Sequence, residues 1–286
     1  MKGTRDNSER RFVKMHGLGN DFVIFDGRAD GFTPSSELAR AVADRKCGVG
    51  CDQVITLERS TRADLFMRIH NPDGSEAGAC GNATRCVAAL AFAETGARDM
   101  TIETRSGVLR ASAEADGRIT VDMGEPRLDW KDIPLARAMD TLDVDFAVTT
   151  PAGVELRAPV AVSMGNPHVV FFVEDAEAVD LDAVGPRIEQ DPLFPERVNV
   201  SVAEVRGRDA MRVRVWERGA GVTLACGSAA CACVVAATRR GLIDGAAAIE
   251  MDGGTLDLTW REDGHVLMTG PTATVFHGTL DLEAAP

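Results

Sequence analysis

The chain has 286 residues, of which 45% are hydrophobic and 26% charged, and a formal net charge of −13 at pH 7. This length predicts one large or two ordinary domains, and the composition is that of a globular protein. The acidic balance argues against a nucleic-acid partner, which would need a basic face, and no apolar run is long enough to cross a membrane.

The polar segment 1–11 lacks the apolar core of a signal peptide, so we expect a disordered extension there and a cytoplasmic location. Seven cysteines are an odd number, which in a cytoplasmic protein favours free thiols over structural disulfides. The spacings of Cys47 with Cys51 and of Cys231 with Cys233 fit zinc knuckles poorly, so no metal is expected.

In the first half, periodicity and turn residues predict short strands and two helices. The helices are expected over 34–45, where a serine can cap the first turn, and over 81–95, which Gly96 ends. The expected strands are 12–15, 22–26, 53–58, 65–70 and a cluster through 101–123.

The second half repeats this order after a break in the pattern around 125–140. Short strands with few helices indicate an α+β fold rather than a doubly wound sheet. The closing segment after Gly270 has no counterpart in the repeat and is expected to return to the first domain. The expected elements are strands over 144–162, 169–173, 199–205, 211–216 and from 249 to about 276, with helices over 181–189 and 227–240.

Two cysteine blocks resemble each other at a distance of 146 residues: Ala79-Cys80-Gly81-Asn82-Ala83 and Ala225-Cys226-Gly227-Ser228-Ala229. Chance explains one Cys-Gly pair well, but it explains a gapless series of matching polar positions poorly. So long a period predicts two duplicated domains rather than a solenoid. The same shift pairs Asn20 with Asn166, Gln53 with Asn199, and Asn71 with Glu217.

Each Cys-Gly pair precedes a predicted helix, and a helix N-terminus both stabilises a thiolate and binds a carboxylate. Two such ends facing one another would hold a carboxylate between two thiols. One thiolate could then remove an α proton while the opposite thiol delivers another, which inverts a stereocentre. The alternatives are two core thiols and a redox pair, although the chain has no Cys-x-x-Cys motif.

From Phe12 to about Gly278 the chain resembles the diaminopimelate epimerase family. The resemblance implies an α+β fold of two pseudo-symmetric duplicated domains, each a mostly antiparallel curved sheet around a central helix. We expect an N-terminal domain of residues 12–127 and 272–286 and a C-terminal domain of residues 128–271. The motifs that carry the resemblance lie at 15–22, 73–76, 80–82, 165–168, 197–199, 217–221 and 224–228.

The resemblance also implies epimerisation of LL-2,6-diaminopimelate to the meso isomer, without pyridoxal phosphate or another cofactor, for lysine and peptidoglycan precursors. It makes Cys80 and Cys226 the acid–base pair, with His168 and Glu217 tuning the pKa of the thiols. A planar Arg218 suits the distal carboxylate of the substrate. The implied substrate-binding residues are Asn20, Gln53, Asn71, Gly81, Asn82, Asn166, Asn199, Glu217, Arg218, Gly227 and Ser228.

The family often has a tyrosine in a dimer contact near the C-terminus, and Phe276 stands there in this chain, so we expect a homodimer. One alternative is a related racemase of the proline racemase type, which needs no clamp for a distal substrate end; Glu217 and Arg218 argue against it. The other is a non-catalytic amino-acid-binding protein, against which the two retained Cys-Gly helix starts argue.

Overall fold

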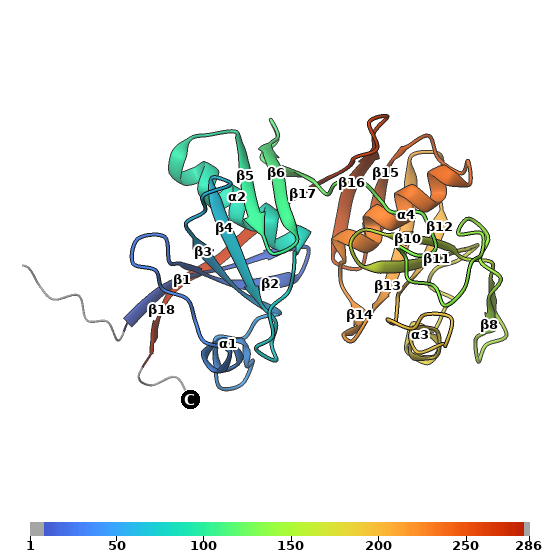
Figure 1. Ribbon diagram of the computed structural model, residues 1–286, viewed down its shortest axis with the longest axis horizontal. Coiled ribbons are helices and arrows are strands. Elements are labelled where there is room, and N and C mark those ends of the chain that lie inside the picture. The colour runs from blue at the N-terminus through green and yellow to red at the C-terminus, as the bar shows by residue number, and fades with distance from the viewer. Residues whose placement is uncertain (1–8, 283–286) are drawn as a thin grey trace, which may run out of the picture. The chain divides into compact units, whose positions relative to one another are not determined.

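The computed structural model describes residues 9–282, and the chain divides into two compact units (Figure 1). Unit 1 is the chain up to Val121 together with the chain from Pro271 onward, and unit 2 is Asp122–Gly270. The boundaries thus fall at 121 and 270, where the sequence suggested 127 and 271. Within the described residues, no helix has the length and apolar character that a membrane crossing requires.

Unit 1 is built on one sheet with the strand order β7-β6-β5-β4-β3-β2-β1-β18. The ladders β2–β3 and β4–β5 are parallel, whereas β1–β2, β3–β4, β5–β6 and β1–β18 are antiparallel. The strands are β1 Glu9–Gly17, β2 Asn20–Asp26, β3 Gln53–Glu58, β4 Leu65–His70, β5 Asp99–Thr104, β6 Gly107–Ala113, β7 Ile119–Asp122 and β18 Ala273–Asp281; the helices are α1 Ser36–Ala43 and α2 Gly81–Thr95.

Helices cover both faces of β2, which explains why its segment Phe22–Phe25 is apolar without alternation. Val23 and Phe25 pack with α1 in one core cluster, and α2 packs over β1, β5 and β6. The alanine-rich α2 has high intrinsic helix propensity, and Gly96 ends it in the left-handed conformation with φ 74°. α2 is thereby held as the central helix of unit 1, with its N-terminus at Cys80.

Unit 2 has the strand order β10-β11-β12-β13-β15-β16-β17, with β14 paired to β13 and a separate hairpin of β8 and β9. Its helix α4 is buried from Ala229 to Ala237 and contacts strands on all sides, so it is the central helix of this unit. The elements are β8 Ala147–Thr149, β9 Glu155–Arg157, β10 Val160–Ser163, β11 Pro167–Val173, α3 Leu181–Glu189, β12 Asn199–Val205, β13 Ala210–Glu217, β14 Gly221–Thr223, α4 Gly227–Arg239, β15 Ala246–Met251, β16 Gly254–Trp260 and β17 Val266–Gly270.

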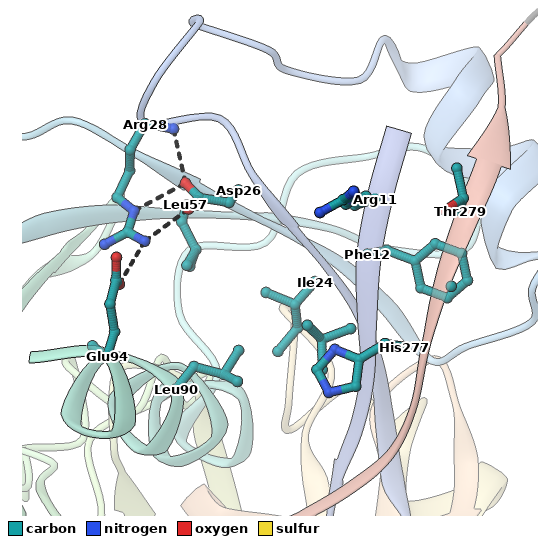
Figure 2. Close-up of a pocket in the computed structure, with 13 residues that line it drawn as sticks. Arg11, Phe12, Ile24, Asp26, Arg28, Leu57, Leu90, Glu94, His277 and Thr279 are labelled. Carbon is teal, nitrogen blue, oxygen red and sulfur yellow. Dashed lines mark hydrogen bonds and ion pairs between the residues drawn. The ribbon is translucent and has the colours of Figure 1, made fainter. Parts of the chain in front are cut away.

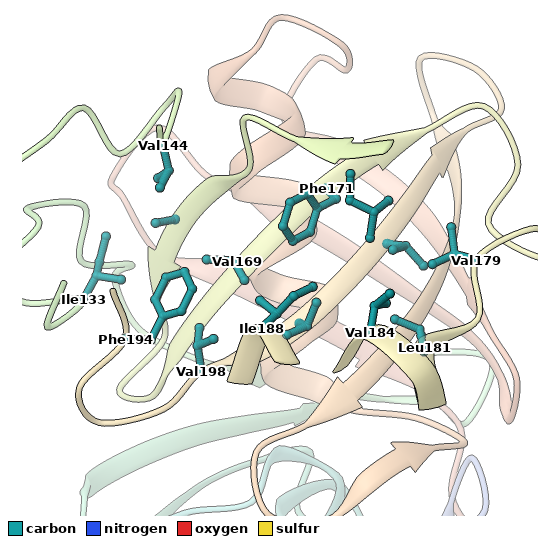
Figure 3. Close-up of a cluster of buried hydrophobic side chains, with 14 of the residues drawn as sticks. Ile133, Val144, Val169, Phe171, Val179, Leu181, Val184, Ile188, Phe194 and Val198 are labelled. Atoms are coloured by element: carbon teal, nitrogen blue, oxygen red, sulfur yellow. The ribbon is translucent and has the colours of Figure 1, made fainter. Parts of the chain in front are cut away.

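In unit 2 an apolar cluster lies between α3 and the face of the sheet opposite to α4 (Figure 3). Val184 and Ile188 of α3 pack with Val169 and Phe171 of β11, and Phe194 belongs to the same cluster. The period of about four between the buried positions of α3 is that of an amphipathic helix on a core. Both faces of the sheet are therefore covered in unit 2 as well.

The strand registers confirm the predicted duplication. The parallel pair of Phe22 with Gln53 recurs as His168 with Asn199, a shift of 146 residues for both partners. Beyond the central helices the shift grows by one residue, and the pair of Ile102 with Leu109 recurs as Ile249 with Leu256. The two units therefore repeat one topology, with a single-residue insertion after the central helix.

The expectation that the closing segment lacks a counterpart is wrong. In unit 1, β18 pairs with β1, with Ala273 opposite His16. In unit 2, Arg127 pairs with Ser163 through two backbone hydrogen bonds of 2.8 and 3.0 Å, and Arg127 precedes Ala273 by the same 146 residues. The counterpart is a single bridge, which is too short to produce a strand pattern in the sequence.

The expected disordered extension is also partly wrong, because β1 begins at Glu9 and residues 9–11 pair with β18. The Arg10 side chain forms an ion pair with Asp30 and stacks 4.1 Å from the centre of the Phe32 ring, which fixes this segment to unit 1. Residues 1–8 lie outside the described residues. The strands predicted over 144–162 are β8, β9 and β10; a turn with Gly153 at φ 85° separates β8 from β9, and Ala158 at φ 51° lies between β9 and β10.

Gly185 in α3 provides a test of helix packing in unit 2. A Cβ atom at this position would lie 2.4 Å from Cγ and Cδ2 of the Trp216 ring. Alanine is the better helix former, which alone would stabilise the protein. The overlap with the Trp216 ring outweighs this gain, so we expect Gly185→Ala to lower the free energy of unfolding by about 1–3 kcal/mol. Urea unfolding measures this change. The exposed control Asp182→Ala should stay within about 0.5 kcal/mol of wild type, and a stabilised Gly185→Ala variant would contradict the packing.

Candidate active site

One group of predicted site residues surrounds Cys80 in unit 1. Cys80 is the N-cap of α2, with φ −151° and ψ 111°, and its half-exposed sulfur donates to Oδ1 of Asn20 at 3.8 Å. The Asn20 oxygen also accepts from Nδ2 of Asn82 at 3.1 Å, and Oδ1 of Asn82 accepts from the buried Arg85 at 2.9 Å. At the other end, Nδ2 of Asn20 donates to Asp52 at 2.9 Å. Cys80 thus lies beside a continuous chain of hydrogen-bonded side chains.

Asp52 belongs to a charged cluster that the sequence motifs did not indicate. Arg45 donates to Asp52 at 2.6 Å and to Asp21 at 2.7 Å, and Lys14 donates to Asp21 at 2.6 Å. Burial acts to raise the pKa of Asp21, but the hydrogen bonds from Arg45 and Lys14 outweigh it and lower this pKa to about 2. The cluster therefore keeps Asp21 ionised. It also fixes the Asp52 carboxylate, which accepts the hydrogen bond from the Asn20 side-chain amide.

Gln53 and Asn71 lie opposite each other where β3 begins and β4 has just ended. Nε2 of Gln53 donates to Oδ1 of Asn71 at 3.0 Å, and Nδ2 of Asn71 donates to Ser75 at 3.1 Å. The buried Oε1 of Gln53 has no hydrogen-bond partner within the described residues. A buried carbonyl oxygen of this kind is suited to a donor on a ligand, such as an ammonium group.

Another group of predicted site residues surrounds Cys226 in unit 2. Cys226 is the buried N-cap of α4, and its sulfur lies 3.5 Å from the Ser228 hydroxyl. Nδ2 of Asn166 donates to this hydroxyl at 3.3 Å, and Oδ1 of Asn166 lies 3.0 Å from Nε2 of His168. An amide oxygen can only accept, so this geometry assigns the ring proton of His168 to Nε2. The Ser228 proton is then available to the Cys226 sulfur.

The electrostatic surroundings of Cys226 favour its neutral form. Burial, and after it the charge of Glu217, raise the pKa of this thiol well above its usual value, while Ser228 and the Ala229 amide act in the opposite direction. The positive end of α4 also opposes the increase. At neutral pH the balance favours a protonated thiol, which is the form that can deliver a proton.

Glu217 is the last residue of β13 and Arg218 follows it, and neighbouring segments hold both. Thr223 of β14 donates to the Glu217 carboxylate, and the Arg218 amide donates to Oδ1 of Asn199 at 2.9 Å. Asn199 is buried, and its Nδ2 donates to the Pro167 carbonyl at 2.8 Å. Asn199 therefore links the first residue of β11 to the residue that follows β13, whereas the Arg218 side chain is exposed.

Glu189 at the end of α3 is a further residue that sequence reasoning missed. Its buried carboxylate accepts from Nε1 of Trp216 at 2.7 Å and from the Gly219 amide at 3.1 Å. These bonds fix the turn that carries Glu217 and Arg218. The sequence signal was only an acidic residue at a helix end, which is ordinarily a surface position.

The structure thus gathers the predicted residues into two groups, one in each unit. Gly81 and Gly227 are the first residues of the two central helices, directly after the cysteines. Phe276 belongs to neither group: it lies on β18, 45% exposed, with its ring edge toward Phe12. Within residues 9–282 no group of three or more His, Cys, Asp and Glu side chains could hold a metal ion.

A cavity of about 570 Å³ lies elsewhere in unit 1, beside β1, β18 and the C-terminal half of α2 (Figure 2). Its floor is apolar, with Ile24 and Leu90, and Arg28 joins Asp26 to Glu94 at its rim (Figure 2). None of the predicted substrate-binding residues lines it. The cavity is therefore separate from the group around Cys80.

A family model and two relatives match along nearly the whole chain. The model described as diaminopimelate epimerase matches residues 12–128 and 160–275. A diaminopimelate epimerase of Rhodospirillum centenum is 59% identical over 280 residues, covering 97% of this chain and 94% of that protein. A diaminopimelate epimerase of Acidiphilium cryptum is 56% identical over 272 residues, covering 95% and 96%.

Two solved structures share the fold at low sequence identity. A hydroxyproline epimerase of Agrobacterium vitis, solved with bound trans-4-hydroxy-L-proline, has a TM-score of 0.69 at 16% identity and covers 98% of this chain and 94% of its own. A phenazine biosynthesis protein of Bacillus anthracis has a TM-score of 0.67 at 18% identity, covering 95% and 99%. These likenesses establish the two-unit α+β fold.

The burial of His168 predicts a pH dependence of stability. Burial, and after it the charge of Arg218, lower the pKa of His168 to about 3 from its usual 6.5. Between these values the unfolded chain binds a proton that the folded chain does not, so stability falls as pH decreases from about 6.5, by up to about 1.4 kcal/mol per pH unit.

Urea unfolding at pH 7.5 and pH 5.0 tests this dependence against the variant His168→Gln. Wild type should lose up to about 2 kcal/mol more than the variant over this interval, because only wild type has the buried imidazole. The exposed control His277→Gln should retain the wild-type dependence. Equal losses in wild type and His168→Gln would contradict a buried neutral His168.

Proposed function

Because the chain belongs to the diaminopimelate epimerase family, we propose that it converts LL-2,6-diaminopimelate to meso-diaminopimelate by proton transfer between two cysteines. The product is a precursor of lysine and peptidoglycan. The observation that carries the proposal is the placement of Cys80 and Cys226 at the N-termini of the two central helices. Cys80 lies beside the Asn20 amide, and Cys226 lies beside the Ser228 hydroxyl, which accepts from Asn166.

In the proposed reaction, one cysteine thiolate removes the α proton, and the electron pair of the broken C–H bond moves toward the neighbouring carboxylate. The opposite thiol then delivers its proton to the other face of the α carbon. The first cysteine ends as a thiol and the second as a thiolate, so the reverse reaction uses the same pair with exchanged roles. No external oxidant, reductant or cofactor enters this balance.

The helix N-termini are suited to the carboxylate next to the reacting carbon. The first backbone N–H groups of α2 and α4 have no partner within their helices, and they lie at Gly81-Asn82 and Gly227-Ser228. These donors and the positive helix ends stabilise negative charge, including the charge that develops on the carboxylate as the α proton leaves. The proposal requires both helix ends to act on one substrate molecule.

The remaining polar residues are suited to the distal amino-acid end of the substrate. The exposed guanidinium of Arg218 can bind a carboxylate with two parallel hydrogen bonds, and Glu217 can accept from an ammonium. Gln53, through its unpaired buried oxygen, offers another acceptor. A cyclic amino acid such as proline has no distal end for these groups, and relatives 49–59% identical carry the name diaminopimelate epimerase, so a proline racemase type of activity is not favoured.

The proposed function is tested with purified, reduced protein and LL-diaminopimelate, without added cofactor. We expect formation of the meso isomer until the two interconvert at equilibrium. Cys80→Ala and Cys226→Ala should each lower kcat by at least about 10³-fold, because each removes one of two obligatory proton carriers. Chiral separation of the isomers measures the rate.

The matched control is Cys231→Ala, which removes a buried thiol within α4 that the mechanism does not use. It should retain kcat within a few-fold while its thermal stability falls. Equal activity in all three variants would contradict the two-thiol mechanism. Failure of wild type to convert either isomer under reducing conditions would contradict the function itself.

We further propose a cytoplasmic location and a homodimer. All seven cysteines are thiols rather than disulfides, which suits a reducing compartment. β18 is the last strand of the unit 1 sheet, and Val275 and Phe276 on it are 54% and 45% exposed. An exposed apolar edge strand is a surface that a second copy of the chain can cover.

The dimer is tested with Phe276→Asp, which places a charge on this apolar surface. We expect the variant to sediment as a monomer at a micromolar concentration at which wild type sediments as a dimer. The control Val108→Asp changes a residue of similar exposure on β6 and should leave the dimer intact. A wild-type monomer, or a dimer that tolerates Phe276→Asp, would contradict this interface.

A further inference from the structure

The hydrogen-bond chain beside Cys80 has a fixed direction. Arg85 can only donate, so the Asn82 oxygen must face it and the Asn82 NH2 group must face Asn20. The Asp52 carboxylate can only accept, so the Asn20 NH2 group must face it. Both ends therefore require the same orientation of Asn20, with its oxygen toward Asn82 and the Cys80 sulfur.

Asp52 is itself fixed by groups outside the motifs around Cys80. One of its oxygens accepts from Arg45 at 2.6 Å, and the other accepts from the Asp21 backbone amide at 3.1 Å as well as from Asn20. The Asp52 amide in turn donates to the Asp21 carboxylate at 2.9 Å. The acceptor for the Asn20 amide is thus held at a defined position.

In unit 2 the asparagine equivalent to Asn20 is oriented by a different residue. The 146-residue repeat places Val198, a buried apolar residue, where unit 1 has Asp52. Asn166 is instead oriented by His168, and it turns its NH2 group toward Ser228 beside Cys226. The two equivalent asparagines therefore present opposite ends of their amides to the two cysteine sites.

We propose that Asp52 is a positioning residue for Cys80, which holds the Asn20 amide with its oxygen toward the sulfur by accepting a hydrogen bond from its NH2 group. Asp52 does not touch the sulfur and acts only through Asn20. Its importance for turnover rests on the proposed function, whereas its effect on the Cys80 thiol does not.

The physical consequence concerns the ionisation of Cys80. An oxygen that accepts from a thiol stabilises the protonated form, whereas an NH2 group in the same place would stabilise the thiolate. Without an acceptor at position 52, only the Asn82 NH2 group still orients the Asn20 amide. The alternative orientation, which offers the Asn20 NH2 group to the sulfur, is then more populated. The charged groups of this cluster are Lys14, Asp21, Arg45 and Asp52, with Arg85 on the helix side.

Two variants distinguish the loss of the hydrogen-bond acceptor at position 52 from the loss of its negative charge. Asp52→Ala removes both, whereas Asp52→Asn removes the same negative charge but retains an amide oxygen that can accept from Asn20. The rate of Cys80 alkylation by iodoacetamide is measured from pH 6 to pH 10 by mass spectrometry of the Cys80 peptide, without substrate. Cys226 in the same molecule is the internal reference.

We expect the Cys80 alkylation profile of Asp52→Ala to shift by about one pH unit below that of Asp52→Asn, which is about tenfold faster alkylation at pH 7. The Cys226 profile should be unchanged in both. Should Asp52→Ala fail to fold, Asp52→Val introduces the residue that the second unit carries and makes the same prediction. Coincident Cys80 profiles in the acceptor-free and amide variants would overturn the proposal, as would equal shifts at both cysteines.

Turnover provides the second readout. The kcat for LL-diaminopimelate should fall about tenfold further in Asp52→Ala than in Asp52→Asn, with the smaller change in KM. If the alkylation profiles of the two variants differ but wild type does not epimerise diaminopimelate, the proposed function is contradicted and the positioning role stands. If wild type turns over the substrate but the alkylation profiles of the two variants coincide, the positioning role is contradicted and the proposed function stands.

Discussion

The structure depends on two buried, alanine-rich helices that each begin at a cysteine. Because α2 and α4 are the central helices of their units, the sheets fix where each helix starts, and hence where each sulfur lies. The N–H groups of the first turn, which have no acceptor within their own helix, then supply donors and a positive potential next to a thiol without any charged side chain. The same feature provides both the thiol chemistry and the carboxylate site that the proposed reaction needs.

Duplication supplied two copies of this feature, and divergence made them different. The strand registers repeat on either side of a single-residue insertion, yet the polar groups beside the sulfurs do not repeat. Asn20 is oriented by a carboxylate in unit 1, whereas Asn166 is oriented by a neutral histidine in unit 2. Cys80 is half-exposed next to an acceptor, and Cys226 is buried next to a hydroxyl and Glu217. The proposed reaction, nearly symmetric about its α carbon, would therefore use two environments of different polarity.

The sequence predicted well those features whose cause is local. The bounds of α2 and α3 were predicted correctly because alanine-rich or amphipathic runs are flanked by capping residues. The sequence failed where the cause is distant: β1 begins at Glu9 only because β18, more than 260 residues later, pairs with it. Asp52, Arg85 and Glu189 were missed for a related reason. A charged residue normally lies at the surface, and only the packed structure shows that these three orient the amides and the turn of the candidate site.

The central claim, proton transfer by two separate thiols, makes an isotopic prediction. In D2O the thiol that delivers the proton carries deuterium, while the thiolate that removes it takes protium from the substrate. Early in the conversion of LL-diaminopimelate, mass spectrometry should therefore find one deuterium at the inverted α carbon of the meso product and none in the recovered substrate. Meso product that retains protium at that carbon, or equal early labelling of substrate and product, would contradict the account.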